Sequence, residues 1–379
     1  MKTKKLLKVV LLSTVIILSS CKKDSPTPLV VDGCTVEAPA TYAFTDDGGV
    51  NTVAYDGQAA RLATGKTVYE VLNANIAIDR LALDVIVDDA NSKLFGKTAE
   101  NSINRAVVID HLNGILDTYC ANSAAYDLGT EASAGTAGLY GEFQLDANGW
   151  EADQQFAKML IGSLCLEQVN YDYLTKMDVD NEDRTYSNFT NGVPNGNNNV
   201  YTKREHYYDE AFGYVYGMDA DISTPAVDEI TGNKYNFLGK YLSKHDGTAY
   251  SMVNYRQIAY DAFKMGRQAV VENCAEEVDR QIAIINSSLS KVVAWHAQSY
   301  LASAAIKIGT EEFHHDVSEA WGFVYSLQFT KVNGAPLFSH AEVMSMISTL
   351  EAGTNGAWDL DATTLNNMAA SINSAVIFD

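Results

Sequence analysis

The sequence predicts an all-α protein of tandem, pseudo-duplicated helical bundles with a short N-terminal extended segment. Apolar residues recur at positions i, i+3, i+4 and i+7 in the longest segments, the amphipathic pattern of packed helices. Only six prolines occur in 379 residues, so long helices have few breaks. One residue pattern also occurs twice, which indicates a duplicated unit. The helical domain is therefore expected at 41–379, as two bundles at about 41–232 and 233–379.

The periodic segments cover most of the second half of the chain and much of the first. In 276–307, for example, Ile282, Ile285 and Leu289 keep the helical spacing. Aromatic and β-branched residues around a Gly-Gly turn predict the short extended segment at 42–55. The helices are expected at 58–73, 77–86, 98–120, 149–176, 203–217, 248–272, 276–307, 311–328, 339–351 and 361–375.

Two long loops interrupt the helical pattern. Residues 127–149 are rich in Gly, Ala and acids, and residues 178–201 are rich in Asp and Asn. Loops of this length are uncommon in compact domains and often carry function. The second loop begins with alternating acids, like a calcium-binding loop, but it lacks the glycine expected at the sixth position and the acid expected at the twelfth. Calcium binding therefore remains the weaker hypothesis for this loop.

The first residues predict a lipoprotein anchor. Lysines precede an apolar run at 9–18, which is too short to span a bilayer and is typical of a secretory signal at 1–20. The segment ends in Leu-Ser-Ser before Cys21, which resembles the bacterial lipobox and implies acylation of Cys21. Residues 21–40 are expected to be a linker. Two or three acyl chains would give stable anchoring to the outer membrane, on its periplasmic or surface face.

The charge of the chain narrows the class of partner. The net charge is −21, and removal of the signal lysines makes it more negative. Such a surface repels phosphate backbones and anionic lipids, so nucleic-acid binding is disfavoured and the lipid alone is expected to contact the membrane. The same field raises the local concentration of cations.

Four cysteines accompany Cys21. Cys34, Cys120, Cys165 and Cys274 allow three disulfide pairings, among which the sequence does not choose. None has the spacing of a zinc-thiolate site. Cys165 lies within an apolar helical pattern, so it is expected to be a buried free thiol.

The repeated pattern is the strongest candidate for function. Residues 206–214 and 315–323 both read His, three residues, Glu-Ala, Phe or Trp, Gly, and Tyr or Phe. On a helix the His, Glu and Gly share one face, opposite an apolar face. A glycine in a helix interior costs roughly 1 kcal/mol relative to alanine, so its presence in both copies indicates close approach of a backbone or a ligand.

Two interpretations of the polar faces remain open. Imidazole and carboxylate groups one turn apart suit a divalent or iron ion, which facing helices could hold together. The candidate metal ligands are His206, Asp209, Glu210, His315 and Glu319. In the structural alternative, the same side chains only cap helices or hydrogen-bond to neighbours. Of the other histidines, His314 is expected at the surface and His296 in the core.

A resemblance to a known family is carried by residues 42–44, 53–58, 61–62, 146–149, 206–214, 265–267 and 318–323. These segments resemble an uncharacterised family of bacterial lipoproteins, a domain of unknown function related to the imelysin-like proteins. The latter are iron-regulated lipoproteins of two helical bundles, grouped with metallopeptidases through a G-x-H-x-x-E motif. Here Arg204 and Asp209 stand where that motif has Gly and Glu. The resemblance implies the double-bundle fold and a role near iron or haem acquisition.

The expected function is that of an outer-membrane-anchored, non-enzymatic binding lipoprotein in iron or other metal uptake. It would bind a metal or metal complex between the bundles. One alternative is an imelysin-like metal-dependent peptidase or hydrolase, with Glu210 or Glu319 as its general base. Another is a structural or partner-binding lipoprotein, attached for instance to an outer-membrane transporter, with no small-molecule site.

Overall fold

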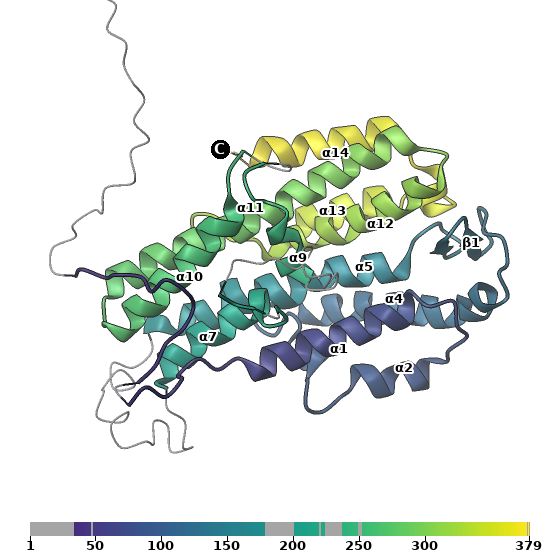
Figure 1. Cartoon of the computed structure of the whole chain (residues 1–379). Helices are drawn as coiled ribbons and strands as arrows, with labels where there is room; N and C mark the ends of the chain where they lie inside the picture. Colours follow the sequence, from purple (N-terminus) through teal and green to yellow (C-terminus); the bar gives the residue numbers. More distant parts are fainter. Residues whose placement is uncertain are drawn as a thin grey trace, which may run out of the picture. The chain divides into compact units, whose positions relative to one another are not determined.

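The computed structural model confirms the all-α class, with one two-stranded sheet beside the helices (Figure 1). Residues Val36–Asp379 form one compact unit. The predicted signal, Cys21, most of the linker and the calcium-like loop lie outside the described residues. The structure describes residues 34–46, 48–178, 201–219, 221–223, 237–248, 252–376 and 378.

The first half of the unit holds four helices, a hairpin and one long irregular helix. The antiparallel hairpin pairs Gly138 with Leu145 and Tyr140 with Phe143. The long helix starts as α-helix, continues through two π-helical stretches and ends as 3-10 helix. In order, the elements are α1 (Asp56–Leu72), α2 (Arg80–Val87), α3 (Leu94–Lys97), α4 (Arg105–Asp127), β1 (Gly138–Tyr140), β2 (Phe143–Leu145), α5 (Ala152–Leu160), η1 (Ile161–Leu166), η2 (Gln168–Asp172) and η3 (Tyr173–Asp178).

In the second half, every described element is a helix. Two of its helices begin with a capping box, in which Thr202 pairs with Glu205 and Ser339 pairs with Glu342. The elements are α7 (Lys203–Tyr216), α9 (Phe237–Ser243), α10 (Tyr255–Val271), α11 (Ala275–Lys307), α12 (Glu311–Ser326), η6 (Leu327–Phe329), α13 (His340–Leu350), η7 (Gly356–Asp359) and α14 (Ala362–Ala375).

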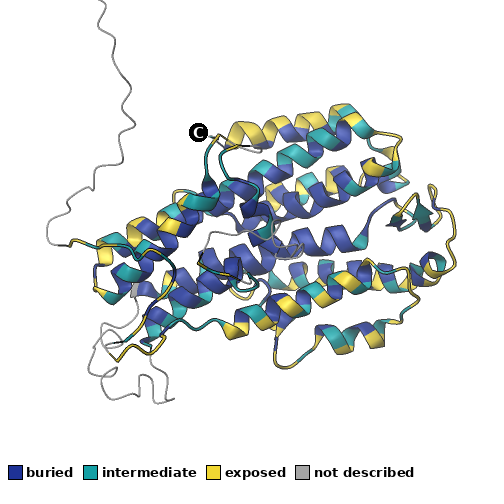
Figure 2. Ribbon diagram, in the orientation of Figure 1, coloured by how far each residue is buried: buried dark blue, intermediate teal, exposed yellow. Residues whose placement is uncertain are grey.

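Helix α5 is the centre of the packing. It contacts α12, α1 and α4, and Figure 2 shows it buried along its length. A helix that is buried on all sides cannot have a solvent face, so its polar residues need partners inside the protein. The contact between α5 and α12 joins the two expected bundles. Their division near residue 232 stays a prediction.

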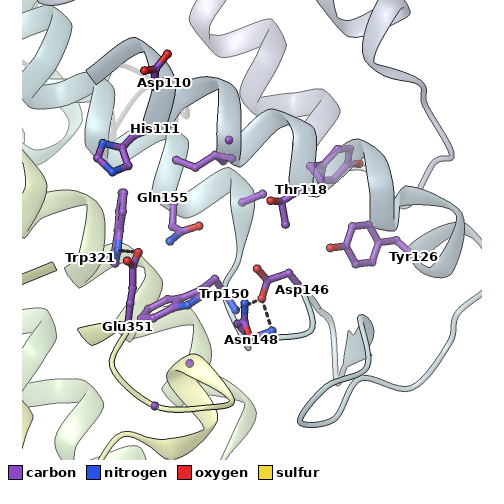
Figure 3. A pocket seen from close by; sticks show the side chains of 16 residues that line it. Asp110, His111, Thr118, Tyr126, Asp146, Asn148, Trp150, Gln155, Trp321 and Glu351 are labelled. Atoms are coloured by element: carbon purple, nitrogen blue, oxygen red, sulfur yellow. Dashed lines mark hydrogen bonds between the residues drawn. The ribbon is translucent and has the colours of Figure 1, made fainter. Parts of the chain in front are cut away.

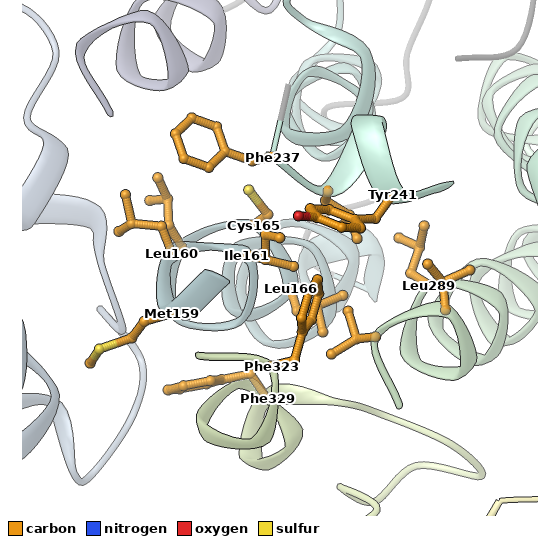
Figure 4. Close-up of a cluster of buried hydrophobic side chains, with 14 of the residues drawn as sticks. Met159, Leu160, Ile161, Cys165, Leu166, Phe237, Tyr241, Leu289, Phe323 and Phe329 are labelled. Atoms are coloured by element: carbon orange, nitrogen blue, oxygen red, sulfur yellow. The ribbon is translucent and has the colours of Figure 1, made fainter. Parts of the chain in front are cut away.

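The apolar core lies where α5 and η1 meet α9, α11 and α12 (Figure 4). Phe323 of α12, Leu289 of α11 and Phe237 of α9 contribute to it, each at most 5% exposed. Cys165 is a fully buried free thiol, as predicted, and Cys120 is also free. Cys34 and Cys274 are disulfide-bonded.

Most predicted helices are confirmed, with shifts that have local causes. The helix predicted at 98–120 is α4, which starts seven residues later at Arg105. Ala99 has a positive φ of 50°, so an α-helix cannot run through it. The loop predicted at 127–149 contains the hairpin, whose strands are too short to show an alternating pattern. The extended segment at 42–55 has one isolated bridge, from Thr45 to Asn51.

No helix in the described parts of the chain is long and apolar enough to cross a membrane.

The glycines of the repeated pattern allow close helix contacts. A Cβ atom at Gly213 would lie 2.5 Å from the Cβ of Tyr55. A Cβ atom at Gly322 would lie 2.5 Å from the Cβ of Lys158 and 3.0 Å from the backbone oxygen of Gln155. The two distances of 2.5 Å are too short for a contact between carbon atoms. Of the two causes expected for these glycines, close approach of a neighbouring part of the chain is confirmed.

We predict that Gly322→Ala lowers the free energy of unfolding by about 1–3 kcal/mol, because α5 must move away from α12. The matched control is Gly114→Ala in α4, where a new Cβ meets no atom within 4 Å. There the variant should gain up to about 1 kcal/mol from helix propensity. Urea unfolding followed by circular dichroism measures both. A stable Gly322→Ala variant would show that the close contact is not required.

Candidate functional site

The two copies of the repeated pattern lie on α7 and α12 in similar surroundings. The side chains of His206 and His315 are each 31% exposed and each lies near a carboxylate. Glu210 and Glu319 each receive a hydrogen bond from another helix. The copies therefore match in environment as well as in sequence.

On α7, the histidine and its glutamate are engaged locally. His206 stacks on Tyr201, with ring centroids 4.5 Å apart. Its Nε2 lies 3.7 Å from Glu210 Oε1, beyond hydrogen-bonding distance. The side chain of Gln58 on α1 donates to the same Glu210 oxygen at 2.9 Å. This Glu thus joins α7 to α1.

Asp209 belongs to a different cluster, deep in the core. Arg267 donates from Nε to Asp209 Oδ1 at 2.9 Å and from a terminal nitrogen to Glu205 at 3.0 Å. Asp209 also accepts the hydroxyl of Tyr42 at 2.7 Å and the backbone N–H of Ala54 at 3.2 Å. The two carboxylates raise the pKa of Arg267, against the effect of burial. Asp209 is therefore a structural anchor of the N-terminal segment.

On α12, His315 pairs with a buried glutamate at the start of α5. Its Nδ1 lies 2.8 Å from Glu151 Oε2. Burial opposes the imidazolium charge, but the hydrogen bond and charge of Glu151 outweigh it and raise the pKa of His315 to about 9. Burial and the charge of Asp153 raise the pKa of Glu151 to about 7, although His315 opposes this. Both groups keep their protons to higher pH than usual.

Glu319 also binds a cation from α5. The Lys158 Nζ lies 2.8 Å from Glu319 Oε1, and both side chains are at most 5% exposed. Tyr241 donates its hydroxyl to the same oxygen at 2.8 Å. Although burial favours the neutral acid, the charges of Lys158 and His315 lower the pKa of Glu319 below its usual range. Glu319 is thus a permanently charged partner of Lys158.

Four of the five predicted metal ligands therefore have separate partners, while His206 stacks on Tyr201 and lies beside Glu210. Glu210 joins α7 to α1, and Asp209 binds Arg267. His315 binds Glu151, and Glu319 binds Lys158. Among the described residues, no three or more His, Cys, Asp or Glu are arranged to hold a metal ion. The hydrogen bonds of the structural alternative are present for these four residues.

Of the predictions for two further histidines, His296 and His314, one is confirmed and one is wrong. His296 lies in the core as predicted, 1% exposed, with its Nε2 3.2 Å from Nε2 of His245. The prediction for His314 was wrong, because it is 3% exposed and its Nδ1 lies 2.8 Å from the carbonyl oxygen of Gly149. Helix α12 is covered on nearly all sides, so neighbouring residues on it are buried together.

A cleft that the sequence did not predict lies between α4, the start of α5, α12 and the segment after α13. Its volume is about 390 Å³. Figure 3 shows aromatic rings and carboxylates around one space. No lysine or arginine is among the described residues that line it. Its chemically distinctive lining residues are Asp110, His111, Tyr119, Tyr126, Asp146, Asn148, Trp150, Gln155, Trp321 and Glu351.

Among the described residues that line the cleft, no lysine or arginine compensates the charge of its acids. Burial raises the pKa of Asp146, and the charge of Glu351 adds to the rise. Burial also raises the pKa of Glu351, although the indole of Trp321 donates to it at 2.8 Å. Burial lowers the pKa of His111, which favours the neutral imidazole. A positively charged ligand would stabilise both carboxylates in their ionised form.

The walls of the cleft are fixed by packing and by a turn. Trp150 is 5% exposed and Trp321 is 2% exposed. Asp146 accepts the backbone N–H groups of Asn148 at 2.8 Å and Trp150 at 3.0 Å, so one acid shapes the turn that presents the indole. The sequence signals for this site were the segments 146–149 and 318–323, which carried the family resemblance and contain Asp146, Asn148 and Trp321.

We predict that His315 titrates near pH 9 by NMR and that Glu151→Gln moves its midpoint down towards the ordinary 6.5. Folding raises the pKa values of both groups, so each protonated group contributes fully to the free energy of unfolding at low pH. The contribution of Glu151 is lost as the pH rises from about 4.5 to 7, and that of His315 as the pH rises from about 6.5 to 9. The control is Glu312→Gln, an exposed acid of α12, which should leave the midpoint unchanged. An unshifted midpoint in Glu151→Gln would contradict the pairing.

The comparisons with known proteins give one match. The model of a family described as "Domain of unknown function (DUF4856)" matches residues 39–378. No curated protein and no solved structure matches the chain. The likeness to imelysin-like proteins stays a prediction. Because the match covers nearly all of the compact unit, the chain belongs to the DUF4856 family, whose function is unknown.

Proposed function

We propose that this chain is a membrane-anchored, non-enzymatic binding protein that takes a small organic cation into the acidic aromatic cleft. The observation that supports this most is the convergence of Asp146 and Glu351 on one cavity without a lysine or arginine among its described lining residues. Buried carboxylates without a cation are costly, and a cationic ligand removes that cost.

The aromatic walls favour an organic cation over a bare ion. Trp150 and Trp321 line the cleft together with the two carboxylates (Figure 3). A cation within about 6 Å of an indole face gains roughly 0.5–2 kcal/mol, more when water is excluded. The net charge of −21 adds a long-range attraction for such a ligand.

A role in metal uptake is compatible with the cleft if the metal arrives as a positively charged complex. The described residues offer no three-ligand group for an ion, so iron or another metal would bind as a positively charged complex. A metal-dependent hydrolase needs such a ligand group and an open coordination position, and no described feature favours it. An outer-membrane transporter as the partner stays a prediction, as does the outer membrane as the location.

The ligand half of the proposal is tested with benzyltrimethylammonium as the probe and tryptophan fluorescence as the signal. We expect saturable quenching that weakens with added salt. Glu351→Gln keeps an acceptor for Trp321 but removes the charge, so we expect about tenfold weaker binding. Glu276→Gln, an exposed acid of α11, is the matched control and should bind like the wild type.

Two results would contradict the cation proposal. One is equal binding by Glu351→Gln and the wild type. The other is equal binding of benzyl alcohol, which has the ring of the probe without its charge. The second result would assign the cleft to a neutral ligand instead.

The anchor half is tested by metabolic labelling with an alkyne analogue of palmitate in a Gram-negative host. We expect the wild type to carry the label and to sediment with membranes. Cys21→Ser should lose the label and move to the soluble fraction, because the lipid supplies the only strong membrane contact. Cys120→Ser, which removes a free thiol of α4, should behave like the wild type. Membrane association of unlabelled Cys21→Ser would overturn the anchor.

A further inference from the structure

A second cavity, of about 260 Å³, lies beside the start of α5. Residues from the end of α1, the hairpin, α5 and α12 line it. Residues 150–153 line two different cavities in alternation. Trp150 and Ala152 line the cleft, whereas Glu151 and Asp153 line this second cavity. The segment thus forms a wall of both, and the two cavities have separate sets of lining residues.

Acids outnumber cations in the second cavity. Glu142, Glu151 and Asp153 line it, and no lysine or arginine does so among the described residues. His315 compensates Glu151. Lys158 is bound to Glu319. Burial raises the pKa of Asp153, and the charge of Lys158 opposes that rise. A further cation in the space would favour the ionised form of Asp153.

The side chain of Gln144 gives a second, independent indication of a ligand, because its oxygen accepts no hydrogen bond from the described residues. Its side chain lines the cavity, and the residue is only 8% exposed. Its Nε2 donates to Asn75 Oδ1 at 2.6 Å, which fixes the orientation of the amide. Its Oε1 is buried, and no donor among the described residues reaches it. Buried acceptors are normally satisfied, so a ligand N–H at this position would complete the site.

The shape of the group that fits follows from the acceptors. Asn73 and Gln154 already donate to Asp153 Oδ2, each at 2.8 Å. The acids do not surround a single point, since no described group of three can hold a metal ion. A group with several N–H donors at tetrahedral angles can reach acceptors that are spread around a cavity.

We propose that this cavity is a second binding site, which takes the primary ammonium group of a small amine. Gln144 Oε1 accepts one N–H of the ligand, and Glu142 and Asp153 supply the negative charge that balances it. The ring of Phe143, which stacks on His315 with centroids 5.0 Å apart, forms one side of the site. This site does not depend on the cleft or on its proposed ligand.

The test uses 1,4-diaminobutane and saturation-transfer NMR of its methylene protons. All variants and analogues are compared in the Glu351→Gln background, in which the cleft has lost one carboxylate. Glu142→Gln should weaken binding about threefold, as expected for an exposed charge. Gln144→Met should weaken it about tenfold, because it removes the unsatisfied acceptor. The analogue with two trimethylammonium ends lacks N–H donors and should bind at least about tenfold more weakly. Thermal melting checks that each variant is folded.

Glu351→Gln separates this site from the cleft. The diamine should still bind to this variant, because the second site keeps all its lining residues, whether or not the cleft also binds a cation. Loss of diamine binding in Glu351→Gln would place the amine in the cleft and overturn the second site. Unchanged binding in both folded variants, Glu142→Gln and Gln144→Met, would overturn it as well, as would failure of the wild type to bind the diamine.

Discussion

The buried ion pair between Lys158 and Glu319 fixes the position of α5, on which both cavities depend. Desolvation of two charges is costly, and only good geometry with further hydrogen bonds offsets that cost. Here the hydroxyl of Tyr241 completes the coordination of Glu319. The absence of a side chain at Gly322 lets the two helices approach closely. Charge and close contact thus act at the same place and define the spacing of α5 and α12.

The first residues of α5 divide their polar groups between two spaces. Because consecutive residues point in different directions, Glu151 and Asp153 serve one cavity while Trp150 and Gln155 serve the other. The side chains from α12 follow this division, since His315 lines the second cavity and Trp321 lines the cleft. One helix pair therefore carries most of the chemistry that the protein offers to small ligands.

Much of the fold could be predicted from the sequence, whereas little of the site could be. Periodicity is a local property, so it located the long helices. The repeated pattern likewise drew attention to His315. Its partner Glu151, however, is 164 positions away in the chain, and no local pattern encodes that contact. The cleft combines α4, α5 and α12 with the turn at Asp146, so it exists only after folding. His314 was misplaced for the same reason, because burial of a second helix face depends on tertiary neighbours.

The attachment of the N-terminal segment to the core has a mechanical consequence. Tyr42 donates its hydroxyl to Asp209, its backbone N–H donates to the hydroxyl of Tyr260, and its ring stacks on Phe212 at 3.6 Å. Tension applied to the chain from its N-terminal side would first reach the disulfide of Cys34. Once that disulfide is reduced, the load would pass through Tyr42 and Asp209 into Arg267, which donates to Asp209. None of these three residues lines the cleft or the second cavity.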